Sequence, residues 1–503
     1  MKNWLILIAL IATITTAQTS TIWDGTADTT WFTDNKEATE FTITTAEELA
    51  GLAVLVNGSA NNGTYNMAGK TIKLGANIML NDTTGWEFWR NTPPENIWAS
   101  IGAGASTGGV GDGSYFAGVF DGNGHTIRGL YIEQPIRAGF FGDAQNSVIK
   151  NIKIAEAYIL SGVSAGGLVG RARNISIINS SYIGRVEGRR QDGTIGGLVG
   201  SGSGVSISNS WYIGAVGGMQ VVGGLIGSTG GGVNQISQSF FKGNIESYSE
   251  TTRMMFGGLI GKMLGATIID SYAIFTFNFV RNTRRDNVIG TIVGVGEPRD
   301  FAFTTESKII NSYSAFTHIN NATALATGIA GSDVSGNVEV IKSYYQRGCV
   351  NDLEGKTSNE MKLKATFADW DFDNIWGIDE NINLGYPYLI ALKEPVTPTS
   401  IKNIKKSDNR YGIRFANNIV SDKAEISVIL PNNERIVETK IVVYDMTGNV
   451  VASTGSATDG TIVWDLRNRA GRFVANGSYL IIVEAKDRNG RTHIYSARLG
   501  VNR

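Results

Sequence analysis

Gly-Gly-Leu-Val-Gly occupies residues 166–170 and occurs again, unchanged, at residues 196–200. Gly-Gly-Leu-Ile-Gly follows at 223–227 and 257–261, Gly-Thr-Ile-Val-Gly at 290–294, and the degenerate Thr-Gly-Ile-Ala-Gly at 327–331. Successive copies begin 30, 27, 34, 33 and 37 residues apart. Self-similarity at this period predicts an array of stacked repeats, each of which covers the apolar side of its neighbour.

A serine follows each pentapeptide at the same place in the repeat. An Ile or Val lies three residues before the serine, and one or two aromatic residues usually come after it. The six positions are Ser180, Ser210, Ser239, Ser271, Ser312 and Ser343. If equivalent residues of successive repeats stack, we expect each hydroxyl to bond to its neighbour in the column or to the adjacent backbone.

The repeats have the composition of short β-strands, because their apolar segments are β-branched or aromatic and bounded by Gly, Asn and Asp. We therefore predict an all-β chain with a parallel β-helix, or solenoid, in which Leu168, Leu198, Leu225 and Leu259 form a column that Ile292 continues. Adjacent Leu and Val point to opposite faces of a regular strand, so we expect a bend that turns both inward. The glycines expected at these bends are Gly166, Gly170, Gly196, Gly200, Gly223, Gly227, Gly257 and Gly261.

The sequence outside the repeats predicts the remaining segments of the chain. A positive Lys2, the apolar run 4–12 and small residues at 15–17 predict a secretory signal peptide at 1–17. We expect an N-terminal cap and first coils at 18–146, the repeat solenoid at 147–350, its C-terminal cap at 351–393, a Pro-containing linker at 394–410, and a small immunoglobulin-like β-sandwich at 411–503.

Composition excludes several classes of protein. The 45 acidic and 44 basic residues nearly cancel, and a nucleic-acid partner would need a concentrated basic patch. The one cysteine, Cys349, allows no intramolecular disulfide, and the three histidines form no His-Glu-x-x-His motif or metal-binding spacing. We therefore predict no cofactor and no metal. After the signal peptide, no run reaches the roughly 18 apolar residues of a membrane span, so no transmembrane segment is expected.

Candidate ligand contacts are few. Trp86, Trp89 and Trp98 lie in a Pro-containing insertion, where they either stack on sugar rings or pack over the end of the solenoid. Asp-Gly-Asn-Gly-His at 121–125 is better explained as a tight turn than as a calcium site, because further acidic positions are missing. Charged loops that differ between repeats, at 187–192, 247–253 and 281–287, are the expected places for binding determinants.

Two resemblances follow from these motifs. The pentapeptide repeats, with Asp-Gly-Asn-Gly-His-Thr-Ile at 121–127 and Gly-Tyr-Pro-Tyr-Leu at 385–389, resemble the GLUG motif of large bacterial surface and secreted proteins. The tail is similar to the immunoglobulin-like domain of flagellar hook-capping proteins and to C-terminal sorting domains of type IX secretion, in the segments 443–448, 463–465, 470–472, 476–479 and 498–501. The second resemblance implies that a type IX-like export machinery is a partner, and that the protein is secreted or lies on the outer surface of a Gram-negative bacterium.

Two functions remain open at this stage. The first is an exported adhesin or binding scaffold, not an enzyme, with an unidentified surface ligand such as a polysaccharide. The second is a carbohydrate-active β-helix, either a polysaccharide lyase or a glycoside hydrolase, or a polysaccharide-binding protein. An enzyme is expected to bring three or more carboxylate, Lys or Arg side chains together along one face.

Overall fold

The computed structural model describes residues 21–58, 64–102, 114–250, 252–279, 287–296, 307–320, 328–333, 338–347, 354–380, 382–392, 412–415, 419–430, 435–445, 450–457, 460–468, 471–474, 477–488 and 492–501. The predicted signal peptide, the predicted linker and Cys349 lie outside these residues. The chain divides into two compact units, one of residues 1–361 and 365–370 and the other of residues 362–364 and 371–503.

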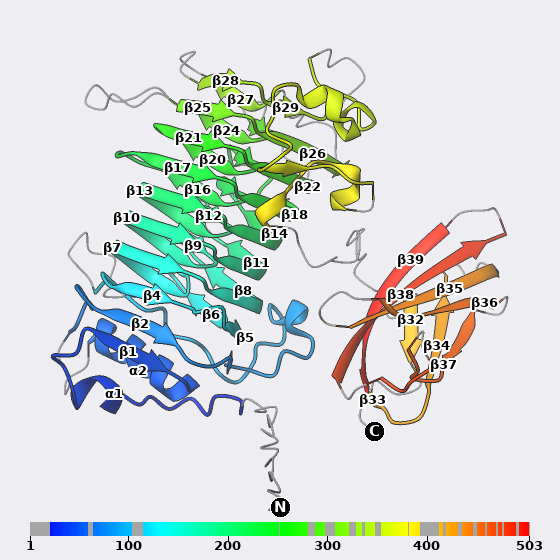
Figure 1. The fold of residues 1–503 in the computed structure, drawn as a ribbon, viewed down its shortest axis with the longest axis horizontal. Helices are drawn as coiled ribbons and strands as arrows, with labels where there is room; N and C mark the ends of the chain where they lie inside the picture. The colour runs from blue at the N-terminus through cyan, green and yellow to red at the C-terminus, as the bar shows by residue number, and fades with distance from the viewer. Residues whose placement is uncertain are drawn as a thin grey trace, which may run out of the picture. The chain divides into compact units, whose positions relative to one another are not determined.

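The first unit is a solenoid of three parallel sheets (Figure 1). The largest sheet has the order β1 (Glu40–Ile43), β2 (Thr71–Leu74), β4 (Val119–Asp121), β7 (Phe141–Lys150), β10 (Val169–Ile178), β13 (Val199–Ser208), β16 (Ile226–Thr229), β20 (Ile260–Met263), β24 (Val293–Gly296) and β27 (Ala330–Asp333). In later coils the second half of the long strand is a separate strand of the same sheet: β17 (Asn234–Ser237), β21 (Ala266–Ile269), β25 (Ser307–Ile310) and β28 (Val338–Ile341). We call this sheet the fourteen-stranded sheet.

Two further sheets close each coil. The ten-stranded sheet contains β3 (Ile78–Met79), β5 (Thr126–Arg128), β6 (Tyr131–Gln134), β8 (Lys153–Ser161), β11 (Ser181–Gly188), β14 (Trp211–Gly218), β18 (Phe240–Ser247), β22 (Tyr272–Phe279), β26 (Tyr313–Asn320) and β29 (Tyr344–Tyr345). The five-stranded sheet contains β9 (Ser164–Gly166), β12 (Thr194–Gly196), β15 (Val221–Gly223), β19 (Met255–Gly257) and β23 (Val288–Gly290). The predicted parallel solenoid is therefore confirmed.

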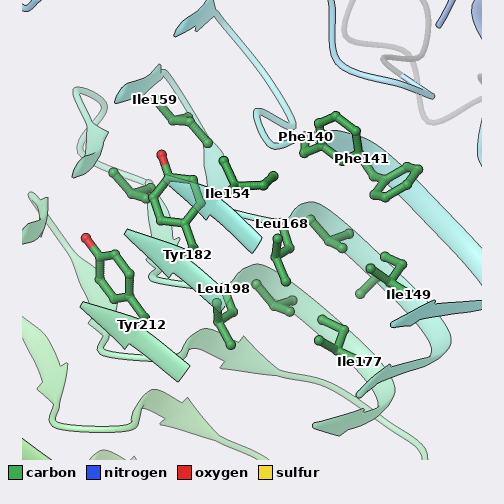
Figure 2. Close-up of a cluster of buried hydrophobic side chains, with 14 of the residues drawn as sticks. Phe140, Phe141, Ile149, Ile154, Ile159, Leu168, Ile177, Tyr182, Leu198 and Tyr212 are labelled. Carbon is green, nitrogen blue, oxygen red and sulfur yellow. The ribbon is translucent and has the colours of Figure 1, made fainter. Parts of the chain in front are cut away.

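The leucines form one continuous column in the interior. The N–H of Leu168 donates to the carbonyl of Leu198 at 3.0 Å, and that of Leu198 donates to Leu225 at 2.9 Å. The column continues through Leu259 to Ile292, with N–O distances of 2.9 and 2.8 Å. Leu168 and Val169 are both fully buried, since the chain bends between β9 and β10 and turns both side chains inward. Figure 2 shows Leu168 beside Leu198 in the interior.

The close approach of neighbouring coils at this bend explains why the repeat has a glycine at position 197. A Cβ at Gly197 would lie 2.0 Å from Cδ1 of Tyr212 and 2.2 Å from the carbonyl oxygen of Gly224 in the next coil. Tyr212 itself stacks on Phe241, with ring centroids 5.4 Å apart, so the ring has a neighbour that limits its movement. A side chain at this position would separate adjacent coils.

The six serines form an unbroken ladder. The backbone N–H of each serine donates to Oγ of the next: Ser180 to Ser210 at 3.0 Å, Ser210 to Ser239 at 3.1 Å, Ser239 to Ser271 at 3.2 Å, Ser271 to Ser312 at 3.1 Å and Ser312 to Ser343 at 3.1 Å. Each Oγ donates in turn to the carbonyl two residues earlier in its own coil, at 2.8 to 2.9 Å. The ladder thus satisfies buried backbone N–H groups where the sheet turns.

The two ends of the solenoid are covered by helical and aromatic segments. The short α1 (Thr30–Thr33) precedes α2 (Ala46–Asn57), whose Thr45–Glu48 capping box is complete. The chain after the last coil forms two short 3₁₀ turns, η2 (Glu360–Lys362) and η3 (Lys364–Phe367). Phe367 packs against Tyr344 with ring centroids 5.3 Å apart, and the indole N–H of Trp370 donates to the carbonyl of Lys342 at 2.8 Å.

The second unit contains a small β-sandwich. Its sheets are β32 (Gly412–Phe415), β34 (Ala424–Ile429) and β37 (Thr461–Trp464) on one side, and β33 (Ile419–Val420), β39 (Thr492–Val501), β38 (Gly477–Asp487), β35 (Ile436–Asp445) and β36 (Val450–Ala457) on the other. The unit also holds β30 (Trp376–Gly377), η4 (Asn383–Gly385), β31 (Tyr388–Leu389) and η5 (Ile390–Leu392). Ile426 and Ile462 of the smaller sheet share one buried cluster with Ile441 and Ile481 of the larger.

Leu225→Asp tests the leucine column. Leu225 is fully buried, so the substitution places a carboxylate where no partner reaches it, and we expect the free energy of unfolding to fall by about 3–5 kcal/mol. Thermal unfolding followed by circular dichroism measures the effect. Val233→Asp is the matched control, because Val233 is 71% exposed. Equal melting temperatures for the two variants would contradict the column.

Candidate functional site

The three tryptophans are packing residues in this structure. Trp98 is 2% exposed and stacks on Phe140, with ring centroids 5.8 Å apart. Trp89 is 3% exposed and meets the ring of Tyr131 edge-on at 5.9 Å, while Trp86 is half-buried against the same cluster. Burial leaves Trp89 and Trp98 no free ring face for a sugar, and it favours the alternative in which the insertion packs on the solenoid.

The sequence at 121–125 forms a turn. Oδ1 of Asp121 accepts the backbone N–H of Asn123 at 2.9 Å and the side-chain amide of Asn151 at 3.0 Å, and Lys150 lies 3.3 Å from Oδ2. Burial opposes ionisation of Asp121, but these contacts outweigh it and lower its pKa. Within the described residues, no group of three or more His, Cys, Asp or Glu side chains is arranged to hold a metal ion.

A charged cluster lies instead on the outer face of the ten-stranded sheet. In β11, Val186 points into the core, so Arg185 and Glu187 on either side of it point outward. Strand register places Glu246 of β18 two strands away from Glu187, with Gly217 of β14 between them. We call the following residues the Glu187 cluster: Arg90, Tyr158, Arg185, Glu187, Glu246 and Tyr248.

Arg185 is the centre of this cluster. Its guanidinium group pairs with Glu187 on one side and Glu246 on the other, and it also donates to the hydroxyl of Tyr248 at 3.0 Å. Tyr248 can reach this position because Gly217 has no side chain; a Cβ there would lie 2.3 Å from the Tyr248 hydroxyl. Tyr248 in turn donates to Glu246 at 2.8 Å.

Two residues distant in sequence complete the cluster. Tyr158 of β8 donates to Oε1 of Glu187 at 2.8 Å. Arg90, which follows η1 (Trp86–Phe88) in the insertion, lies 3.5 Å from Oε2 of Glu187, and its guanidinium carbon is 5.6 Å from the centre of the Tyr248 ring. The cluster therefore fixes the insertion to the outer face of the solenoid.

The electrostatics of the cluster favour fixed charges. Burial raises the pKa of Glu187, but Arg185, Tyr158 and Arg90 together outweigh burial and lower it overall. Burial, followed by the Glu187 charge, raises the pKa of Tyr158, and burial with the Glu246 charge raises that of Tyr248. Glu187 and Arg185 thus stay charged, and Tyr158 and Tyr248 stay protonated, near neutral pH. This state is suited to holding structure or a polar ligand.

Sequence reasoning missed most of this cluster. Glu187 and Tyr248 do fall at the edges of two charged segments, 187–192 and 247–253, that were expected to carry binding determinants. The sequence signal that could have revealed the cluster is the spacing of two between polar residues on one strand face. Arg185 and Glu187 have this spacing in one repeat, and Glu246 and Tyr248 have it two repeats later. Arg90 gave no signal, because only the folded insertion brings it to Glu187.

Comparisons with known proteins give distant structural likenesses alone. No family model matches the chain, and no curated protein matches it. Among solved structures, the chain is similar to one described as IgA1 Protease, with 17% identity, a TM-score of 0.41, and coverage of 61% of this chain and 21% of that one. Dimeric latent PorU from Porphyromonas gingivalis is similar over 18% of this chain and 9% of its own, with 24% identity and a TM-score of 0.15.

PorZ, described as an essential surface component of the type IX secretion system of Porphyromonas gingivalis, is similar over 25% of this chain and 16% of its own, with 15% identity and a TM-score of 0.14. The matched part is thus a small fraction of each of these proteins. None of the helices in the described part of the chain has the length and apolar character needed to cross a bilayer.

One expectation is corrected by these comparisons. We expected a protein that is not an enzyme, but a structurally similar chain is described as a protease. The fold therefore does not exclude catalysis, and the non-enzymatic assignment is withdrawn. At this distance the similarity transfers no protease activity to the present chain.

Glu187→Gln tests the role of the Glu187 cluster. The folded-state pKa of Glu187 lies below its ordinary value of 4.5, so its contribution to stability is complete above that pH and is lost as pH falls through the lowered value. We expect the variant to lose about 1–3 kcal/mol at pH 7 and to show a flatter loss of stability in acid. Melting temperatures between pH 7 and about pH 3 check both effects.

Glu37→Gln, at an exposed position, is the control for this measurement. If Glu187→Gln and Glu37→Gln follow the same pH curve as the unmodified protein, the cluster does not hold the insertion through ionic contacts.

Proposed function

We propose that this protein is exported to the surface of a Gram-negative bacterium, or secreted, and that its solenoid is an adhesin or binding scaffold for a polysaccharide. The observation that carries the proposal is the register of the fourteen-stranded sheet. Outward positions on successive strands form polar columns, such as Arg171, Ser201, Ser228 and Lys262. Side chains in such a column are one strand spacing apart, roughly 4.8 Å, on a rigid surface.

A regular polar surface suits a regular ligand. A linear polymer laid across these strands meets a polar side chain at each of the four coils, and hydroxyl side chains match the hydrogen-bonding groups of sugars. Because the array is preformed, its side chains lose little freedom when such a ligand binds. Repetition of weak contacts along one polymer then raises the overall affinity.

The proposed export route uses the C-terminal sandwich. We infer that residues 1–17 direct the chain out of the cytoplasm, that residues 411–503 are the sorting domain, and that a type IX-like export machinery recognises this domain. The support is the resemblance of its sequence to sorting domains, together with a sandwich fold that has its own buried core. The segments at 18–146, 147–350 and 351–393 are then the cap, repeats and cap of the exported solenoid.

A carbohydrate-active enzyme is the second candidate, because Glu187 and Glu246 lie on either side of one arginine. Glycosidic cleavage by a carboxylate pair needs one carboxyl group with a raised pKa as general acid. The pKa of Glu187 is lowered, and its side chain is fully buried. Glu187 therefore does not match that general acid.

Polysaccharide binding is measured with the purified protein on an array of neutral, sulfated and uronic acid-containing polysaccharides. We expect saturable binding to at least one class. Release of reducing or unsaturated ends would replace the scaffold with the second candidate, and absence of binding to every polymer would contradict both.

Deletion of residues 411–503 measures the export route. Expressed in a bacterium with a type IX secretion system, the shortened chain is expected to remain in the periplasm, because the sorting domain is missing. Limited proteolysis of the retained protein shows whether the solenoid is folded. Surface display of a folded, shortened chain at the level of the full-length protein would refute the sorting role.

A further inference from the structure

Three arginine side chains converge on one buried carboxylate at the outer face of the fourteen-stranded sheet. Asp143 of β7 is fully buried, and its Oδ2 lies 2.7 Å from Nε of Arg171, 3.5 Å from Nη1 of Arg137 and 3.7 Å from Nη2 of Arg173. Strand register explains the meeting: Arg171 of β10 is directly beside Asp143, and Arg173 is beside Gln145. We call Arg137, Asp143, Arg171 and Arg173 the arginine cluster.

The cluster has more positive charge than its carboxylate can balance. Asp143 supplies one negative charge against three guanidinium groups, which leaves a local excess of two positive charges. Within the described part of the chain, the ion pairs of these arginines are all with Asp143. Burial, and then the charges of Arg171 and Arg173, lower the pKa of Arg137, as expected where like charges crowd together.

The cluster is open to solvent and has a free hydrogen-bond donor. The side chains of Arg171 and Arg173 are 27% and 39% exposed. Nε of Arg173 is buried and has no hydrogen-bond partner, although a buried N–H without one is costly. An anion placed between the exposed guanidinium groups of these two arginines would offset their repulsion.

We propose that the arginine cluster binds an anionic group, a sulfate or a carboxylate, of an acidic polysaccharide. This inference rests on the proposed function and names the substrate class for it. Guanidinium groups pair with sulfate and carboxylate oxygens through two parallel hydrogen bonds, which gives direction as well as charge.

The neighbouring residues favour a sugar polymer as the source of the anion. Ser201 and Ser203 of β13 lie next to Arg171 and Arg173 in strand register, and both are half-exposed. The exposed amide of Asn174 continues the same face and donates to Asn146 at 3.3 Å. One compact cationic site beside hydroxyl and amide groups fits a charged sugar with neutral neighbours, whereas a nucleic acid needs a continuous basic path.

The paired substitution Arg171→Gln with Arg173→Gln tests the site. It removes the excess charge but leaves Arg137 to pair with Asp143. We expect the affinity for a heparin-derived hexasaccharide or for oligogalacturonate to fall at least about tenfold, since the variant loses charge-assisted hydrogen bonds to the anion. Binding to neutral polysaccharides should stay the same. Comparing the affinities for the sulfated hexasaccharide and for the carboxylated oligogalacturonate shows whether the site prefers sulfate or carboxylate.

A matched control removes two positive charges elsewhere on the same sheet. Lys73 of β2 and Lys308 of β25 are half-exposed and pair with Glu40 and Glu339. Lys73→Gln with Lys308→Gln should leave acidic polysaccharide binding within about twofold, because surface ion pairs contribute little. If the paired arginine variant does not fold, Arg173→Gln alone is measured, as Arg173 is the most exposed of the three arginines.

The outcomes separate this inference from the proposed function. Equal binding of acidic probes by the paired arginine variant and the unmodified protein overturns the arginine site and leaves the scaffold intact. Failure of all polysaccharides to bind overturns the scaffold. Inorganic sulfate is then the remaining probe: a rise in melting temperature that the paired arginine variant loses supports the anion site, and no rise overturns it.

Discussion

The hydrogen bonds between successive coils are the constraint on which the rest of the structure depends. Each coil is too thin to bury its apolar side chains, so its stability comes from the coil above and the coil below. The parallel ladder fixes register, and register brings like residues together: leucine on leucine, tyrosine on tyrosine, serine on serine. The serine ladder matters most where the strands end, since there the sheet alone does not provide an acceptor for the buried N–H of Ser210 or Ser239.

The sequence predicted those features that recur with the repeat. Leucine and serine columns follow from period and polarity, and the inward bend follows from placing Leu168 and Val169 side by side next to glycine. Features that occur once were not predictable. From its sequence the insertion with Trp89 is open to either packing or binding, and the structure shows its contact with Tyr131. The role of Arg90 depends on how that insertion folds, and the repeat period carries no information about it.

Charged side chains that do not recur from repeat to repeat make the outer surface of the solenoid differ from coil to coil. Arg185 pairs with both Glu187 and Glu246, so the Glu187 cluster joins strands of different coils through paired charges. The arginine cluster is the opposite case, in which Asp143 cannot satisfy its three partners. Both clusters combine residues from adjacent coils, so both exist only because register holds.

Amide hydrogen exchange at Ser210 tests the central claim most directly. Its N–H is bonded to Oγ of Ser239 in the next coil, so Ser239→Ala removes the acceptor and leaves the surrounding backbone in place. The account predicts faster exchange at Ser210, equivalent to a loss of about 1–3 kcal/mol of protection, with no change for Ser206→Ala on the outer face of β13. Unchanged protection at Ser210 in Ser239→Ala would contradict it, since the coils would then be held in register by something other than this ladder.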